Sequence, residues 1–255
     1  MIAILGAMRE EVAPLLERIK DYKEVKHANT LVLEANQEEI TPILEMVGEY
    51  KTTEYANNKF YEANYKGKNL VIAYSKIGKV NAALPASAMI EKFGADKLLF
   101  TGVAGALNPN LKIGDMLYAT SLVQHDVDIT AFGHPYGYVP ETSIFIKSDD
   151  ALNALASSVA AEKGIALKGG VIATGDQFIC DNAKKEWLKA TFKADAAEME
   201  GASVALVCES LGVPFFMLRA ISDEAGGSAE FDFDKFLQDS ANVSAQFMLA
   251  MIERL

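Results

Sequence analysis

The sequence predicts an α/β fold, a three-layer sandwich in which a mostly parallel or mixed central sheet is flanked by helices. Short β-branched runs alternate with longer helical stretches along the 255-residue chain, and half of the residues are apolar. No Pro/Ser-rich linker divides the chain. We therefore expect one domain that spans residues 1–255.

The elements follow from this alternation in chain order. The short β-branched runs predict strands at Ile2–Leu5, Leu70–Tyr74, Lys97–Thr101, Met116–Leu122, Gly170–Ala173 and Pro214–Ile221. The longer stretches predict helices at Glu10–Lys20, Asn81–Phe93, Asp149–Lys163, Ala183–Thr191, Gly201–Leu211 and Asp232–Arg254. Asp149 and Asp232 are suitable N-caps, because an aspartate side chain accepts hydrogen bonds from free backbone N–H groups.

A tandem repeat interrupts the regular pattern near the N-terminus. Residues 9–36 recur at residues 37–64, an offset of 37 − 9 = 28. The identities extend beyond apolar positions, so a chance likeness of two amphipathic helices does not explain them. We expect a duplication of one helix and one strand, in which one copy fills the native slot and the other bulges out or packs on an edge. A lone duplicate is not a solenoid.

Composition excludes several classes of partner. The formal net charge of −11 disfavours binding to nucleic acid or to anionic membrane surfaces. No apolar run is long enough to span a bilayer, and the N-terminus reads as a strand rather than a signal peptide. Cys180 and Cys208 are too few for a disulfide scaffold, which favours the cytoplasm.

Metal binding is also disfavoured. His125 lies in a Gln-His-Asp-Val-Asp run at residues 124–128, but the chain has only three scattered histidines. We expect this run to be a structural loop or an interface segment, and we expect no metal and no cofactor.

Two segments in the last third of the chain carry carboxylates. The apolar run that ends at Ser222 and Asp223 is typical of a buried strand that delivers a carboxylate to the rim of a sheet. Apolar neighbours raise the pKa of such a group, so Asp223 could act as an acid near neutral pH. Glu198 and Glu200 flank Met199 before a small-residue helix start. They could bind the hydroxyls of a sugar diol or only compensate the charge of the helix terminus.

Three loops after predicted strands could approach a ligand. Met8 and Glu11 follow the first strand, although Glu11 alone is also typical of a first helical turn. Ala104 and Gly105 lie in a glycine-containing turn that is a weak signal by itself. Phe178 could stack on a planar base or could be a core residue. A further segment, Ala225-Gly226-Gly227-Ser228, is flexible enough for a lid or is an idle loop.

Taken together, these segments resemble the purine nucleoside phosphorylase/uridine phosphorylase superfamily, and most of all its hydrolytic branch, the 5′-methylthioadenosine/S-adenosylhomocysteine nucleosidases. The matching motifs are Gly6-Ala7-Met8-x-Glu10-Glu11, Ile77-Gly78-Lys79-Val80, Thr101-Gly102-x-Ala104-Gly105, Asp128-x-Thr130-Ala131-Phe132-Gly133, Gly175-Asp176-x-Phe178-Ile179, Glu198-Met199-Glu200 and Arg219-Ala220-Ile221-Ser222-Asp223. Only the duplicated 28 residues fall outside the pattern.

The resemblance implies cleavage of the N-glycosidic bond of a 5′-thioadenosine by water. It implies that Asp223, helped by Ser222, protonates N7 of adenine and that Glu11, or Glu39 of the second copy, activates the water. The implied substrate contacts are Met8, Ile77, Ala104, Gly105, Phe178, Ile179, Cys180, Glu198, Met199, Glu200, Ser222, Ala225 and Phe233. The family is dimeric, so Ile129, Phe132 and Pro140 would reach into the pocket of the neighbouring subunit.

Water is favoured over phosphate as the nucleophile. Phe100 stands where the related phosphorylases carry a phosphate-binding arginine, and Val103 replaces a phosphate-binding serine. The motifs at residues 73–79 and 123–126 are similar to those of futalosine-pathway bacteria, so 6-amino-6-deoxyfutalosine is a further candidate substrate. A phosphate-dependent phosphorylase and a non-catalytic nucleoside-binding protein remain the alternatives.

Overall fold

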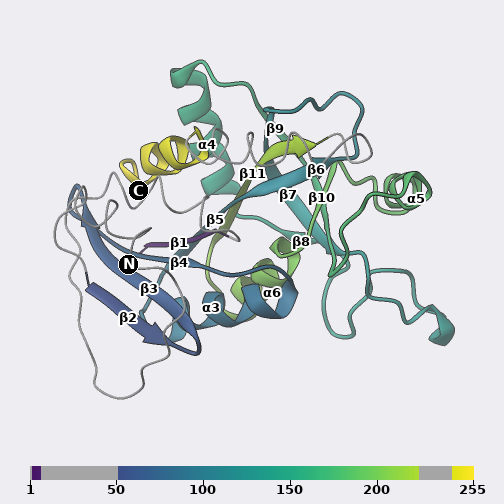
Figure 1. Cartoon of the computed structure of the whole chain (residues 1–255), viewed down its shortest axis with the longest axis horizontal. Coiled ribbons are helices and arrows are strands. Elements are labelled where there is room, and N and C mark those ends of the chain that lie inside the picture. The colour runs from purple at the N-terminus through teal and green to yellow at the C-terminus, as the bar shows by residue number, and fades with distance from the viewer. Residues whose placement is uncertain (1, 7–50, 224–242) are drawn as a thin grey trace, which may run out of the picture.

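A computed structural model describes residues 2–6, 51–223 and 243–255 of the chain (Figure 1). The first copy of the repeat, the expected helix Glu10–Lys20 and the expected cap Asp232 lie outside the described residues. Every predicted strand is present, as are the helices predicted within the described part of the chain.

The strands form one mixed sheet whose order is β2-β3-β4-β1-β5-β11-β6-β10-β9-β7-β8. Their bounds are β1 Ile2–Gly6, β2 Lys51–Tyr55, β3 Asn58–Tyr65, β4 Lys68–Tyr74, β5 Lys97–Thr101, β6 Val103–Ala106, β7 Met116–Gln124, β8 Ile146–Lys147, β9 Leu167–Thr174, β10 Ala196–Glu198 and β11 Phe215–Asp223. An additional pairing between β11 and β7 closes β11, β6, β10, β9 and β7 into a ring. The second half of the sheet is therefore a small barrel rather than an open sheet.

The helices end close to the predicted positions. Their bounds are α3 Lys79–Glu91, α4 Asp150–Lys163, α5 Asn182–Phe192 and α6 Gly201–Leu211, with a short 3₁₀ helix η1 at Thr130–Phe132 and a last helical stretch at residues 243–252. The predicted cap Asp149 is confirmed: its Oδ1 accepts a 2.8 Å hydrogen bond from the backbone N–H of Leu152. None of the helices in the described residues is both long and apolar enough to cross a membrane.

Helices cover both faces of the sheet, which confirms the three-layer prediction (Figure 1). On one face α3 and α6 pack through small apolar residues such as Ala82, Ala86, Ala202 and Ala205. On the other face α4 and residues 243–252 pack through larger side chains, and Phe247 is fully buried there. Small residues on α3 and α6 let these two helices lie close to the strands whose ends form the site.

The described part of the second repeat copy forms a hairpin on the edge of the sheet. Strands β2 and β3 pair antiparallel with Tyr55 opposite Asn58, and β3 pairs with β4. The intervening residues Ala56 and Asn57 both have positive φ, 49° and 59°, as a two-residue turn of a hairpin requires. The prediction of a single strand in each copy is therefore wrong for this part of the chain, because the Ala-Asn turn divides it into two.

Candidate active site

A pocket lies beside the central strands of the barrel. It is lined by Gly105, Gln177, Phe178, Ile179, Ala197, Glu198 and Met199. Strand β6 lies between β10 and β11 in the sheet. The backbone of Gly105 is in register with Ala197 of β10 on one side and with Asp223 of β11 on the other. The end of β11, which carries the predicted acid, is thus a direct sheet neighbour of a residue that lines the pocket.

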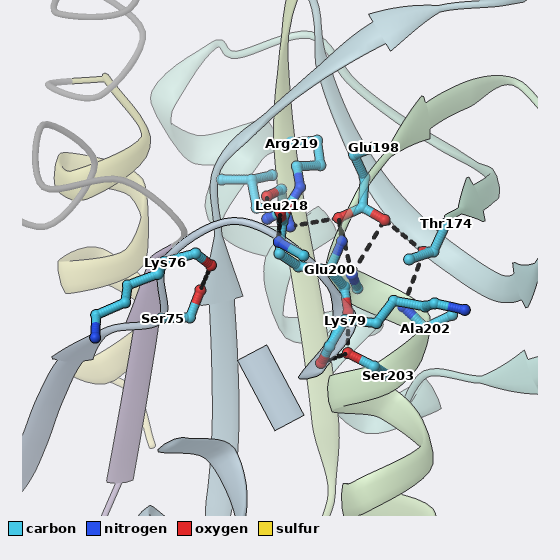
Figure 2. A network of polar contacts seen from close by, with 12 residues as sticks. Ser75, Lys76, Lys79, Thr174, Glu198, Glu200, Ala202, Ser203, Leu218 and Arg219 are labelled. Carbon is cyan, nitrogen blue, oxygen red and sulfur yellow. Dashed lines mark hydrogen bonds and ion pairs between the residues drawn. The ribbon is translucent and has the colours of Figure 1, made fainter. Parts of the chain in front are cut away.

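The carboxylate of Glu198 is the centre of a buried polar network (Figure 2). One oxygen accepts a hydrogen bond from the hydroxyl of Thr174, and both oxygens accept from the backbone N–H of Gly201 at 3.0 and 2.8 Å. Its Oε2 also accepts from the backbone N–H of Glu200 at 3.1 Å. These bonds hold the N-terminus of α6 against the ends of β9 and β10, as expected where a carboxylate meets free helix N–H groups.

Arg219 completes this network from β11. Its Nη2 lies 2.8 Å from Oε2 of Glu198, and the guanidinium lies over the ring of Phe100 with its Cζ 4.2 Å from the ring centroid. Arg219 is fully buried. The motifs predicted no function for Arg219, although a single charged residue within an apolar strand indicates that a buried partner exists.

Glu200 lies at the N-terminus of α6 and is 5% exposed. Its Oε1 accepts a 2.9 Å hydrogen bond from the backbone N–H of Gly78, the residue that precedes α3. Ser203 donates to the backbone carbonyl of Glu200 at 2.6 Å. The hydrogen bond between Gly78 and Glu200 joins two segments that lie 122 positions apart in the sequence, and it fixes one oxygen of the Glu200 carboxylate.

The predicted substrate contacts have different degrees of exposure. Phe178 is 62% exposed, so it is not a core residue, and Ile77 is 55% exposed. Cys180 is exposed, Ile179 and Met199 are partly buried, and Ala104 and Ser222 are buried. Exposed aromatic and apolar side chains beside a pocket are available to contact a ligand. Met8, Glu11, Ala225 and Phe233 lie outside the described residues.

The residues predicted to reach a neighbouring subunit lie on the loop between β7 and β8. Phe132 is 81% exposed, Pro140 is exposed and Ile129 is partly buried. None of the three lines the pocket of its own chain. Tyr136 of the same loop packs edge-on against Trp187 of α5, with ring centroids 5.0 Å apart, so the loop is anchored on the helix that follows the segment predicted to contact the purine.

His125 is buried where β7 meets this loop, and neither ring nitrogen has a hydrogen-bond partner among the described residues. A Cβ atom at Gly175 would lie 2.4 Å from its Nε2, so only glycine fits there. Burial lowers the pKa of His125 below its ordinary value of 6.5, against the smaller opposing effect of Asp126. The described residues contain no group of three His, Cys, Asp or Glu side chains that could hold a metal ion.

Comparison with known proteins identifies the family. The sequence model of the phosphorylase superfamily matches residues 1–253. This chain belongs to the phosphorylase superfamily. The resemblance drawn from the motifs is confirmed, and the nucleoside phosphorylase-like sheet of this superfamily is the fold described above.

Superfamily members similar to this chain are named as nucleosidases. An aminodeoxyfutalosine nucleosidase of Campylobacter jejuni is 58% identical over 254 residues, which covers 100% of this chain and 99% of that protein. A 5′-methylthioadenosine/S-adenosylhomocysteine nucleosidase of Staphylococcus carnosus is 37% identical over 260 residues and is covered completely, as is this chain. The crystal structure of a Campylobacter jejuni 5′-methylthioadenosine/S-adenosylhomocysteine nucleosidase has a TM-score of 0.86 at 58% identity, covering 100% of this chain and 99% of that one.

Proposed function

We propose that this protein is a nucleosidase that hydrolyses the N-glycosidic bond of 5′-methylthioadenosine, S-adenosylhomocysteine and 6-amino-6-deoxyfutalosine, and so releases adenine. The observation that carries this proposal is full-length similarity at 58% identity to an enzyme named for aminodeoxyfutalosine, together with a solved structure at the same identity that is named for the two thioadenosines. A pocket lined by the exposed ring of Phe178 and by Glu198, two residues before Glu200, supports it, because a purine needs a stacking surface and a ribose diol needs a carboxylate.

Asp223 is the proposed general acid. Adenine is a poor leaving group as an anion, and protonation at N7 removes that barrier. A positioned general acid contributes about 10²–10⁴ in rate. The register of Asp223 with Gly105 favours this assignment, because Gly105 lines the pocket in which the base would lie. Ser222, which is 2% exposed, precedes it as the proposed helper.

Glu11 is the proposed base that activates water, and Glu200 is the proposed ligand of the ribose 2′ and 3′ hydroxyls. Loss of the purine makes the ribosyl centre oxocarbenium-like, and a carboxylate beside it stabilises the positive charge. Water then attacks the face opposite the base, with the division of acid and base that inverting glycosidases use. The carboxylate of Glu198 accepts hydrogen bonds from the backbone N–H of Glu200 and from Arg219, and it thereby holds the backbone of Glu200 in place.

Water is the proposed nucleophile because the described residues leave no cation free for phosphate at Phe100. This ring is fully buried, and the guanidinium that stacks on it is paired with Glu198. An additional anion there would lie next to that carboxylate and be repelled by it.

A homodimer in the cytoplasm is the proposed working form. Phe132 presents an apolar ring that is 81% exposed on the loop after β7, as expected for a residue that a second copy covers. In such a dimer Ile129, Phe132 and Pro140 would contribute to the 5′ end of the partner's pocket. Both cysteines of the chain are free, which suits a reducing compartment.

The test is adenine release from 5′-methylthioadenosine in the presence and absence of phosphate. We expect the same rate in both. A rate that requires phosphate would identify a phosphorylase, and tight binding without adenine release would identify a binding protein. Asp223→Asn should bind substrate and lose most of the turnover, and near-normal turnover would refute the acid assignment.

A further inference from the structure

Lys79 at the start of α3, Asp126 in the loop after β7 and Asp176 in the loop after β9 form a closed ring of hydrogen bonds next to the pocket. The Lys79 Nζ donates to Asp126 Oδ1 at 2.7 Å, and the backbone N–H of Asp176 donates to the other oxygen of Asp126 at 2.9 Å. The ring closes because the backbone N–H of Lys79 donates to Asp176 Oδ1 at 2.7 Å. Gln124 accepts a further bond from Lys79 Nζ at 3.3 Å. We call Lys79, Asp126 and Asp176 the Lys79 ring.

The Lys79 ring is adjacent to the proposed ribose ligand. The residue before Lys79 is Gly78, whose N–H binds Glu200 Oε1. Ser203 donates both to the backbone carbonyl of Lys79, at 2.9 Å, and to that of Glu200 (Figure 2). Gly78 has a φ of 98°, and a Cβ there would lie 3.1 Å from Asp176 Oδ1. A glycine at this position lets Glu200 and Asp176 accept hydrogen bonds from two consecutive backbone N–H groups at the start of α3, those of Gly78 and Lys79.

The ion pair in the ring is largely sheltered from solvent. The side chains of Lys79 and Asp126 are 17% and 14% exposed. Burial alone would raise the pKa of Asp126, but the bonds from Lys79 and from the Asp176 backbone outweigh it and leave the pKa below its ordinary value. A sheltered pair with two further hydrogen bonds holds its geometry better than an exposed pair does.

We propose that Lys79, Asp126 and Asp176 are positioning residues that set the orientation of Glu200 toward the ribose diol. This inference rests on the proposed function. The ring fixes the backbone at the start of α3, the Gly78 N–H fixes one carboxylate oxygen, and the carboxylate is thereby aimed at the two hydroxyls. The same ring ties the β7–β8 loop, which carries the proposed subunit contacts, to the sugar site through Asp126.

The experiment compares 5′-methylthioadenosine with its 3′-deoxy analogue, which lacks one hydroxyl that Glu200 would bind. We expect Lys79→Met to lower kcat/KM for the ribonucleoside about tenfold, the effect of one charge-assisted hydrogen bond. For the 3′-deoxy analogue we expect a smaller loss of about threefold, since only the 2′-hydroxyl contact of Glu200 remains to be disturbed. Lys168→Met is the control for loss of a paired lysine, because Lys168 forms a 2.6 Å pair with Asp115 that is more exposed than the Lys79 pair and involves no residue that lines the pocket.

An equal loss for both substrates, or no loss, would overturn the proposal. Asp126→Asn provides a second variant of nearly the same shape if Lys79→Met does not fold, and it should narrow the preference for the ribonucleoside in the same way. Different results would contradict the proposed function and the role of the Lys79 ring. A wild-type protein that releases no adenine contradicts the proposed function. A wild-type protein that favours the ribonucleoside, with variants that keep that preference, contradicts the Lys79 ring alone.

Discussion

The Nη2 atom of Arg219 lies 2.8 Å from Oε2 of Glu198, and the two side chains are 0% and 3% exposed. This ion pair links β11, which ends in the proposed acid, to β10, which leads into the proposed ribose ligand. Its burial makes each partner dependent on the other, because an unpaired charge in an apolar interior is costly.

We predict that Glu198→Gln lowers the free energy of unfolding by about 3–5 kcal/mol, since it leaves the Arg219 guanidinium buried beside Phe100 without a counter-charge. Urea unfolding followed by circular dichroism measures this. Glu186→Gln is the control, because Glu186 pairs with Lys189 on the exposed face of α5 and should change stability little. Equal midpoints for the two variants would contradict the prediction.

His125 should make the protein less stable in mild acid. Burial lowers its pKa in the folded protein below 6.5, so as the pH falls the unfolded chain binds a proton at His125 before the folded protein does. Above pH 6.5 this effect vanishes, and below it stability falls by up to about 1.4 kcal/mol per pH unit until the folded pKa is reached. The lowered pKa of the neighbouring Asp126 places its own titration below this window.

The measurement is the free energy of unfolding between about pH 7.5 and about pH 5.5. His125→Gln should flatten the dependence of the free energy of unfolding on pH. If the wild type and His125→Gln have the same slope, His125 is not the responsible group.

Local sequence signals predicted much of the fold. The bounds of α6 agree with the prediction at both ends, and Asp149 caps α4 as expected, because these features depend on residues a few positions apart. Strands β6, β8 and β10 were not predicted, since runs of four, two and three residues carry too little periodicity. Their place is set by tertiary pairing, as in the register of Gly105 with Ala197 and Asp223.

Site residues could be predicted where a local motif follows a strand. The partners that hold them could not be predicted where they are distant in the sequence. Glu200 and Phe178 are named by local patterns. The bonds from Lys79 to Asp126 and Asp176 join residues 47 and 97 positions apart, and no local pattern specifies such partners. The single charge of Arg219 within an apolar strand was the one signal that could have identified the buried pair.

The repeat gives a prediction about length. The β2–β3 hairpin, which pairs with β4, begins at Lys51 in the second copy, while β1 leads directly into the first copy. Deletion of residues 21–48 removes one repeat length of 48 − 21 + 1 = 28 residues and joins the start of copy one to the end of copy two. We expect the shortened protein to keep its melting temperature and its adenine release. Loss of both would mean that the deleted residues are required.

The same repeat duplicates the proposed base. Glu11 and Glu39 occupy matching positions in the two copies. Only the first copy follows Gly6-Ala7-Met8 at the end of β1, so Glu11→Gln should abolish most of the turnover and Glu39→Gln should not. Initial rates of adenine release compare the two variants. The reverse order would assign the base to the second copy, and two active variants would mean that either copy can serve.

Hydrolysis in ¹⁸O-labelled water shows whether water is the nucleophile. If water attacks the ribosyl carbon, mass spectrometry of the products from 5′-methylthioadenosine will show free adenine without label and 5-methylthioribose with one ¹⁸O atom at C1, in buffer with or without phosphate. A phosphorylated sugar, or a sugar without label, would show that water does not attack the ribosyl carbon.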